Sequence, residues 1–253
     1  MSPMKKVPPP VFQCREAWGG NKKIEQDIEI GDLRGFLLSR PYNASEGGDL
    51  HFLSFCEEEN ISKIVIADVS GHGDIVSRAA SAIKGLLQKY IDELDNSRLL
   101  ESINRSVRRR LFNGKFVTMV AATYRGINKE LIYAYAGHPT LLQYQKAERN
   151  WQVLHAPENG GMPLGIIGNA GYFQIETRLN SGDLLLFYTD GLLNVKINST
   201  IQISIEELLS FCRSLNADRL RPREISESLI KQITRSSSAG FTDDVTLLVL
   251  EAA

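Results

Sequence analysis

Four runs of the sequence are apolar on both of their alternating faces. They are IVIA at 64–67, MVAA at 119–122, LLLFY at 184–188 and TLLVL at 246–250. Strands of this kind are covered on both sides. Strand-like and helical runs do not alternate one by one along the chain, so a doubly wound sheet is not expected. The pattern predicts an α+β fold: a four-layer α/β/β/α sandwich with two central antiparallel sheets flanked by helix pairs.

The remaining periodicity supplies the other elements of this sandwich. Apolar residues that recur every three to four positions predict four helices, over 74–94, 96–112, 204–215 and 222–236. Strands separated by turn signals are predicted over 33–40, 49–57, 61–68, 116–124, 130–137, 140–145, 151–156, 172–179, 183–190 and 243–251. No linker or repeat follows the proline-rich start, so we expect a flexible segment over 1–12 and a single domain over 13–253.

The charge balance bears on the kind of partner. With 29 basic and 30 acidic residues the formal net charge is -1, so no overall basic field attracts nucleic acid or an anionic membrane. The first residues contain no apolar segment of the length found in signal peptides. The three cysteines are scattered without metal or redox spacing. We therefore expect a cytoplasmic protein that binds neither nucleic acid nor membrane.

Aspartates stand at the ends of several apolar strands. Asp68 and Asp190 each end one such strand, Asp243 and Asp244 precede another, and Asp49 follows two glycines at the start of a fourth. At any single position an aspartate that initiates a turn is the simpler explanation. If the strand ends converge, however, two like charges 4 Å apart cost ~1 kcal/mol in water and ~4 kcal/mol at a surface-like dielectric.

A convergent group of carboxylates would need cations. Oxygen ligands without cysteine or histidine at ligand spacing favour hard ions such as Mg²⁺ or Mn²⁺. Two such ions that share a carboxylate lower the pKa of a water molecule and position a phosphoryl group for in-line attack. The strand-end aspartates thus predict a two-metal hydrolase.

Six motifs in this order resemble the metal-dependent Ser/Thr protein phosphatases (PPM, type 2C), in particular the bacterial SpoIIE/RsbU branch. They are GGD, ADVSGHG, YAGHP, GMPLG, LLLFYTDGL and TDDVTLLVL, and the resemblance runs from about residue 40 to residue 250. The family fold is the α/β/β/α sandwich that the periodicity predicts independently. The resemblance implies two divalent metal ions, Mn²⁺ or Mg²⁺.

The resemblance also implies roles for individual residues. Asp68 would bridge both metals, and the Val69 carbonyl would be a further ligand of one. Asp190 and Asp243 would complete the shell of the other metal, so these two and Asp68 are the candidate catalytic residues. Asp49 matches an early acidic position that holds a metal or its water molecules.

Other positions receive supporting roles or depart from the family pattern. Asp244 and Gly71 would support the site, Gly71 because the backbone must turn sharply there. Ser70 stands where eukaryotic relatives carry a proposed general acid, and His72 comes two residues later, so His72 is a supporting residue more than a proton donor. Arg40 could bind the substrate phosphate with its guanidinium fork, although an ordinary surface arginine is an equal alternative.

The predicted function is a Ser/Thr phosphoprotein phosphatase in bacterial signalling. In the branch that the chain resembles, the substrate is typically a phosphorylated anti-sigma-factor antagonist. We expect a separate sensor or regulatory protein, or the first ~40 residues of the chain, to control the enzyme. The alternative is a non-catalytic phosphatase-like module that binds a partner. A phosphodiesterase or similar two-metal hydrolase is a third interpretation, less favoured because those sites usually mix histidine with aspartate.

Overall fold

The computed structural model describes residues 16–71, 74–110, 115–157, 160–195, 203–237 and 240–253. The flexible segment predicted over 1–12 and the supporting residue His72 lie outside the described residues. Within the described part, no helix is both long and apolar enough to cross a membrane.

In the part of the chain that the structure describes, twelve strands form two six-stranded sheets in which every neighbouring pair is antiparallel. Sheet A has the spatial order β1 (Glu16–Lys22), β4 (Glu46–Cys56), β5 (Ile61–Val69), β6 (Val117–Arg125), β7 (Glu130–Ala136) and β10 (Gln174–Arg178). Sheet B has the order β2 (Ile24–Ile30), β3 (Leu33–Arg40), β12 (Val245–Ala252), β11 (Leu184–Tyr188), β8 (Leu142–Gln145) and β9 (Asn150–Val153). Both sheets therefore combine strands from distant parts of the chain.

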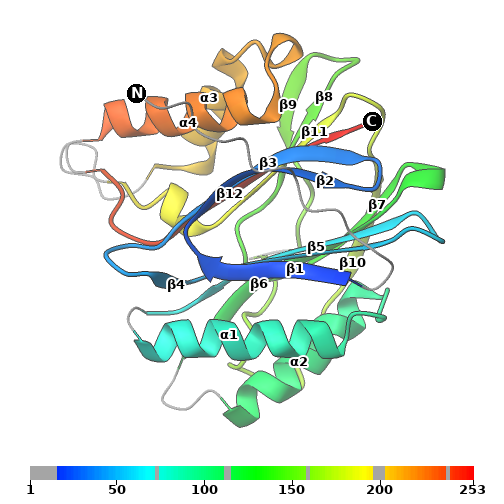
Figure 1. Ribbon diagram of the computed structural model, residues 1–253, viewed down its shortest axis with the longest axis vertical. Coiled ribbons are helices and arrows are strands. Elements are labelled where there is room, and N and C mark those ends of the chain that lie inside the picture. Colours follow the sequence, from blue (N-terminus) through cyan, green and yellow to red (C-terminus); the bar gives the residue numbers. More distant parts are fainter. Residues whose placement is uncertain (1–15, 72–73, 111–114, 158–159, 196–202, 238–239) are drawn as a thin grey trace.

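Helices cover the outer face of each sheet, as Figure 1 shows. Helices α1 (Asp74–Lys89) and α2 (Asn96–Arg110) lie on sheet A, and α3 (Ile205–Ser214) and α4 (Pro222–Ser236) lie on sheet B. Short 3-10 turns occur at Gly126–Asn128, Asp190–Leu192 and Ala217–Arg219. The predicted four-layer α/β/β/α sandwich is confirmed.

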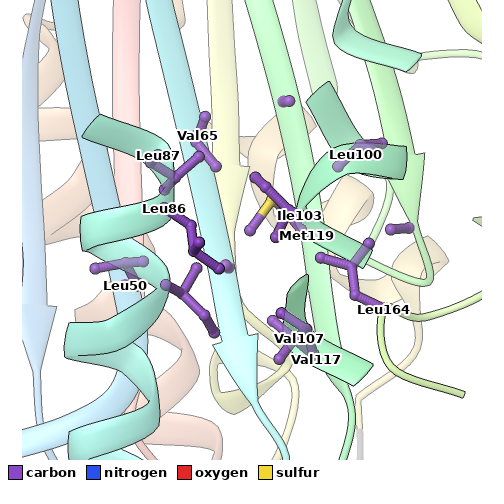
Figure 2. Close-up of a cluster of buried hydrophobic side chains, with 14 of the residues drawn as sticks. Leu50, Val65, Leu86, Leu87, Leu100, Ile103, Val107, Val117, Met119 and Leu164 are labelled. Atoms are coloured by element: carbon purple, nitrogen blue, oxygen red, sulfur yellow. The ribbon is translucent and has the colours of Figure 1, made fainter. Parts of the chain in front are cut away.

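Three hydrophobic cores separate the four layers, which explains the strands that are apolar on both faces. In β5, Ile64 and Ile66 point into the core between the sheets, whereas Val65 and Ala67 point into the core under α1 and α2. Figure 2 shows this second core, in which Leu86 of α1 meets the sheet beside Val65. Burial of each such side chain contributes about 1.5–3 kcal/mol.

The boundaries differ from the predicted ones in a few places. Strands β1 and β2 were not predicted, and each forms an edge of its sheet. The first helix ends at Lys89 and not near residue 94, because a turn follows in which Tyr90 accepts a backbone hydrogen bond from Glu93. Helix α4 covers the predicted range 222–236.

Candidate active site

Asp68 lies near the end of β5, a central strand of sheet A. It pairs with Thr118 on β6, and Val69 is the only residue of the strand that follows it. Burial, and then the carboxylates of Asp190, Asp243 and Asp244, raise the pKa of Asp68 to about 7. Because carboxylates from two other segments, the turn after β11 and the residues before β12, act on this one group, the strand ends do converge.

Asp49 lies deeper, on β4 beside Asp68. Its side chain is buried, and burial followed by the charge of Asp68 raises its pKa well above the ordinary range. The buried Thr189 hydroxyl donates a hydrogen bond of 2.7 Å to Asp49 Oδ2 and accepts one of 3.0 Å from the Thr246 backbone N–H. These bonds orient Asp49. A role for Thr189 or Thr246 was not predicted from the sequence.

Asp244 is a positioning residue. Its Oδ1 accepts a 2.6 Å hydrogen bond from the Tyr42 N–H, and its Oδ2 accepts one of 2.5 Å from the Gly48 N–H. Both oxygens thus hold the segment that leads into Asp49, which agrees with a supporting role. The next carboxylate, Asp243, accepts a hydrogen bond from the Asp244 N–H at 2.9 Å.

Gly48 lets β4 lie close against the end of β5. A Cβ atom there would lie 2.7 Å from Val76 Cγ1, 2.9 Å from the Val69 carbonyl oxygen and 3.5 Å from Asp68 Oδ1. Both oxygens therefore lie beside Gly48, and a side chain at position 48 would collide with its neighbours. Gly71 follows with φ of 103°, a conformation that favours glycine.

Lys115 borders the same turn. A Cβ atom at Gly71 would lie 2.6 Å from Lys115 Nζ, and this ammonium donates a 3.2 Å hydrogen bond to the Ser70 carbonyl. Lys115 follows a long helix at a distance in sequence from every strand-end aspartate. Its position beside the candidate site was therefore not predicted.

Asp190 begins the short 3-10 turn that follows β11. Its carbonyl accepts hydrogen bonds from the N–H groups of Leu193 and Asn194, both at 2.8 Å, so the turn holds the residue in place. Shielding by the surrounding protein, and then the Asp243 carboxylate, raise the pKa of Asp190. The residue itself is exposed and accessible to a ligand.

The contacts of Arg40 and His138 bear on the roles of these two residues. Arg40 ends β3 next to the Asp244 segment, but its Nε donates a 2.9 Å hydrogen bond to Glu25 Oε1. The buried His138 shares a 2.9 Å hydrogen bond with the Thr118 hydroxyl, and burial lowers its pKa to about 3. His138 is therefore neutral near pH 7.

The donor set fits a hard divalent cation. Among the described residues, no three His, Cys, Asp or Glu side chains are already grouped closely enough to hold an ion. Burial and then neighbouring carboxylates raise the pKa values of Asp49, Asp68 and Asp190, and a cation would offset both effects. The Val69 carbonyl and water would supply further oxygen ligands.

The pH dependence of stability tests this repulsion. Metal-free folded protein keeps the Asp68 proton up to about pH 7, whereas the unfolded chain loses it near the ordinary value of 3.8. The folded state binds more protons in this window, so the contribution of Asp68 to stability is present at low pH and is lost as the pH rises to 7. The Asp68→Asn variant lacks this titrating group. We expect the Tm of the variant, relative to the Tm of the wild type, to be higher at pH 8 than at pH 5 by at least about 3 °C.

Differential scanning calorimetry of the two metal-free proteins measures this difference. A constant difference across the pH range would show that the neighbouring carboxylates do not repel Asp68.

Comparisons with known proteins identify the family of the chain. The family model described as Stage II sporulation protein E (SpoIIE) matches residues 59–253. Phosphoserine phosphatase RsbU of Bacillus subtilis (strain 168) is 27% identical over 233 residues, which cover 89% of this chain and 64% of RsbU. The chain thus spans less than two thirds of that relative.

Solved structures agree on the fold. The RsbU and RsbW domains of Rv1364c from Mycobacterium tuberculosis superpose with a TM-score of 0.70 at 24% identity, over 93% of this chain and 60% of that one. RsbX in complex with magnesium gives a TM-score of 0.67 at 18% identity, over 91% of this chain and 100% of that one.

Proposed function

The chain belongs to the SpoIIE family, and from this premise we propose that it is a metal-dependent phosphatase that removes phosphate from serine or threonine of a phosphoprotein. The observation that carries the proposal is the convergence of Asp68, Asp190 and Asp243 at the strand ends, where burial and then the charges of Asp190 and Asp243 raise the pKa of Asp68, and burial and then Asp243 raise the pKa of Asp190. Structural carboxylates at separate turns would not repel one another in this way.

We assign the metal-binding roles as follows. The Asp68 carboxylate and the Val69 carbonyl both lie beside Gly48, and they would hold one ion, with Asp68 shared between two. Asp190 and Asp243 would hold the other ion, and Asp49 would orient its water molecules. Two divalent ions, Mn²⁺ or Mg²⁺, would lower the pKa of water there and offset the charge of the phosphoryl group.

The other residues keep this arrangement in place. The Thr189 hydroxyl fixes the Asp49 carboxylate, and Asp244 fixes the backbone of Gly48. Since these bonds link segments from both sheets, the site depends on the whole sandwich. We accordingly propose that residues 13–253 act as a single phosphatase domain.

Arg40 is our proposed contact for the substrate phosphate. Its guanidinium has N–H groups beyond the Nε that Glu25 binds. We expect Arg40→Ala to raise the KM for 4-nitrophenyl phosphate about threefold to fivefold, with little change in kcat, as suits a half-exposed charge pair. The control is Arg34→Ala on the same strand, which removes an arginine paired with Glu29. Equal KM values in the two variants would leave Arg40 an ordinary surface residue.

The physiological setting is part of the same proposal. By family resemblance the substrate would be a phosphorylated anti-sigma-factor antagonist or a similar regulator. A separate sensor or regulatory protein would control the activity, and the enzyme would work in the cytoplasm. The named activity of the relative RsbU, a phosphoserine phosphatase, supports the choice of phosphoserine.

Hydrolysis of 4-nitrophenyl phosphate by the purified chain tests the function. We expect turnover that depends on millimolar Mn²⁺ or Mg²⁺ and disappears when the metal is removed. A folded protein without turnover at these concentrations would favour the non-catalytic binding module. Faster hydrolysis of bis(4-nitrophenyl) phosphate would favour the phosphodiesterase interpretation.

A further inference from the structure

A cavity of about 420 Å³ lies at the edge of sheet A, where β1 passes between α1 and the start of β2. Its lining includes Trp18, Gly20, Lys22, His51 and Lys84. None of the strand-end aspartates lines it. The cavity is therefore separate from the candidate active site.

A bulge and a glycine create this space. The pairing of β1 with β4 shifts between Gly20 and Lys22, and Gly20 stands opposite His51. A Cβ atom at Gly20 would have no atom within 4 Å, and the residue is outside the positive-φ region. The edge strand thus carries no side chain at the position paired with His51.

His51 has an unsatisfied polar atom in this place. Its side chain is 3% exposed, and its Nδ1 makes no hydrogen bond within the described part of the chain. The ring lies 5.1 Å from that of Trp18 at an angle of 46°. A buried polar atom without a partner is unfavourable, because it has lost its hydrogen bonds to water. A ligand in the cavity would supply the missing partner.

The charge of the cavity indicates the class of ligand. Lys22, Lys23 and Lys84 line it, and among the described residues Glu46 is the one acidic member of the lining. Glu46 is paired with Lys22 at 3.2 Å, and Lys84 Nζ donates to the Gly19 carbonyl at 2.6 Å. The lysine excess attracts an anion, and oxygen atoms accept the hydrogen bonds that ammonium and imidazole N–H groups donate.

Asn21 connects the cavity with the candidate active site. This buried residue also lines the cavity, and its Nδ2 donates to the Gly47 carbonyl at 2.9 Å and to Ser77 Oγ of α1 at 3.2 Å. Gly47 precedes Gly48, which borders Asp68 and the Val69 carbonyl. A ligand that displaces β1 would therefore displace the segment beside the aspartates.

We propose that the cavity around His51 binds a small oxyanion, a sulfate- or carboxylate-type ligand, and that the bound anion changes metal activation at the aspartates through Asn21. The second part rests on the proposed phosphatase function. The first part does not, because binding is measured without turnover.

Binding is tested with ¹⁹F NMR on metal-free protein that carries 5-fluorotryptophan. The chain has two tryptophans, so Trp18→Phe assigns the Trp18 signal. We expect titration with sodium sulfate or sodium succinate, at ionic strength held constant with chloride, to shift the Trp18 signal and saturate. Gly20→Leu fills the cavity and should abolish the shift. The matched control Gly171→Leu, at another glycine with open space around it, should keep it.

Two results would overturn the binding site: no saturable shift with either anion, or the same shift in Gly20→Leu.

For the effect on activation, we expect the saturating anion to change the Mn²⁺ concentration for half-maximal turnover at least twofold in wild type and not in Gly20→Leu. An equal change in both proteins, or none in an active wild type, would contradict the link through Asn21. An inactive wild type would instead count against the phosphatase assignment and leave the NMR result standing.

Discussion

Asparagine in place of Asp68 is expected to lower metal-dependent kcat/KM by more than about 100-fold, because loss of groups that only support a metal ligand already costs 10- to 100-fold. Asparagine keeps the shape of the side chain and removes the charge that two cations would share. The measurement is 4-nitrophenyl phosphate hydrolysis over a range of Mn²⁺ concentrations. Asp190→Asn should be similarly inactive.

The same substitution should leave the fold intact and stabilise the metal-free protein near pH 8. Asp68 is ionised there against burial and neighbouring carboxylates, so its neutral replacement removes a repulsion. Lost activity together with an unchanged or raised Tm separates a functional role from a structural one. We expect His72→Ala to cost less activity than either aspartate variant. Retained activity in both aspartate variants would contradict the two-metal assignment.

Gly191→Ala is expected to have the second largest effect. A Cβ atom at this position would overlap the Asp244 carbonyl oxygen and lie 3.5 Å from Asp243 Cβ. Because the obstacle is backbone, either the turn after Asp190 or the start of β12 must move. Overpacking of this kind costs about 1–3 kcal/mol, which for a chain of this size lowers the Tm by roughly 2–12 °C.

Activity should fall together with stability, because both segments carry candidate metal ligands. We expect a loss of at least tenfold in turnover at saturating Mn²⁺. Gly171→Ala is the matched control, since a Cβ atom there would have nothing within 4 Å. If Gly191→Ala has the activity and Tm of this control, the site does not need the close approach of the turn after Asp190 to the start of β12.

The layers could be predicted from the sequence because burial on two faces leaves a direct trace. Leu248 faces the core between the sheets, while Leu247 faces α3 and α4, so both positions must be apolar. Strand β1 leaves no such trace. Its sequence EAWGGNK contains two adjacent glycines, and it becomes a strand through its pairing with β4. That pairing is a tertiary contact that local pattern does not reveal.

Part of the candidate site could likewise be predicted from the sequence, and part could not. Aspartates directly after an apolar strand are visible in the sequence, and the structure brings those strand ends together. Thr189 was missed because its partner Asp49 is 140 residues away. The ion pair of Arg40 with Glu25 was also not predicted, since β2 had not been recognised. The metal-binding roles of Asp49, Asp68, Val69, Asp190 and Asp243 stay predictions.

Anomalous diffraction from crystals soaked in Mn²⁺ tests whether the strand-end aspartates hold two metal ions. We expect two anomalous peaks at the strand ends, with Asp68 between them, the Val69 carbonyl against one, and Asp190 and Asp243 against the other. A well-diffracting soaked crystal with no peak beside Asp68, or with Mn²⁺ bound only elsewhere, would contradict this expectation.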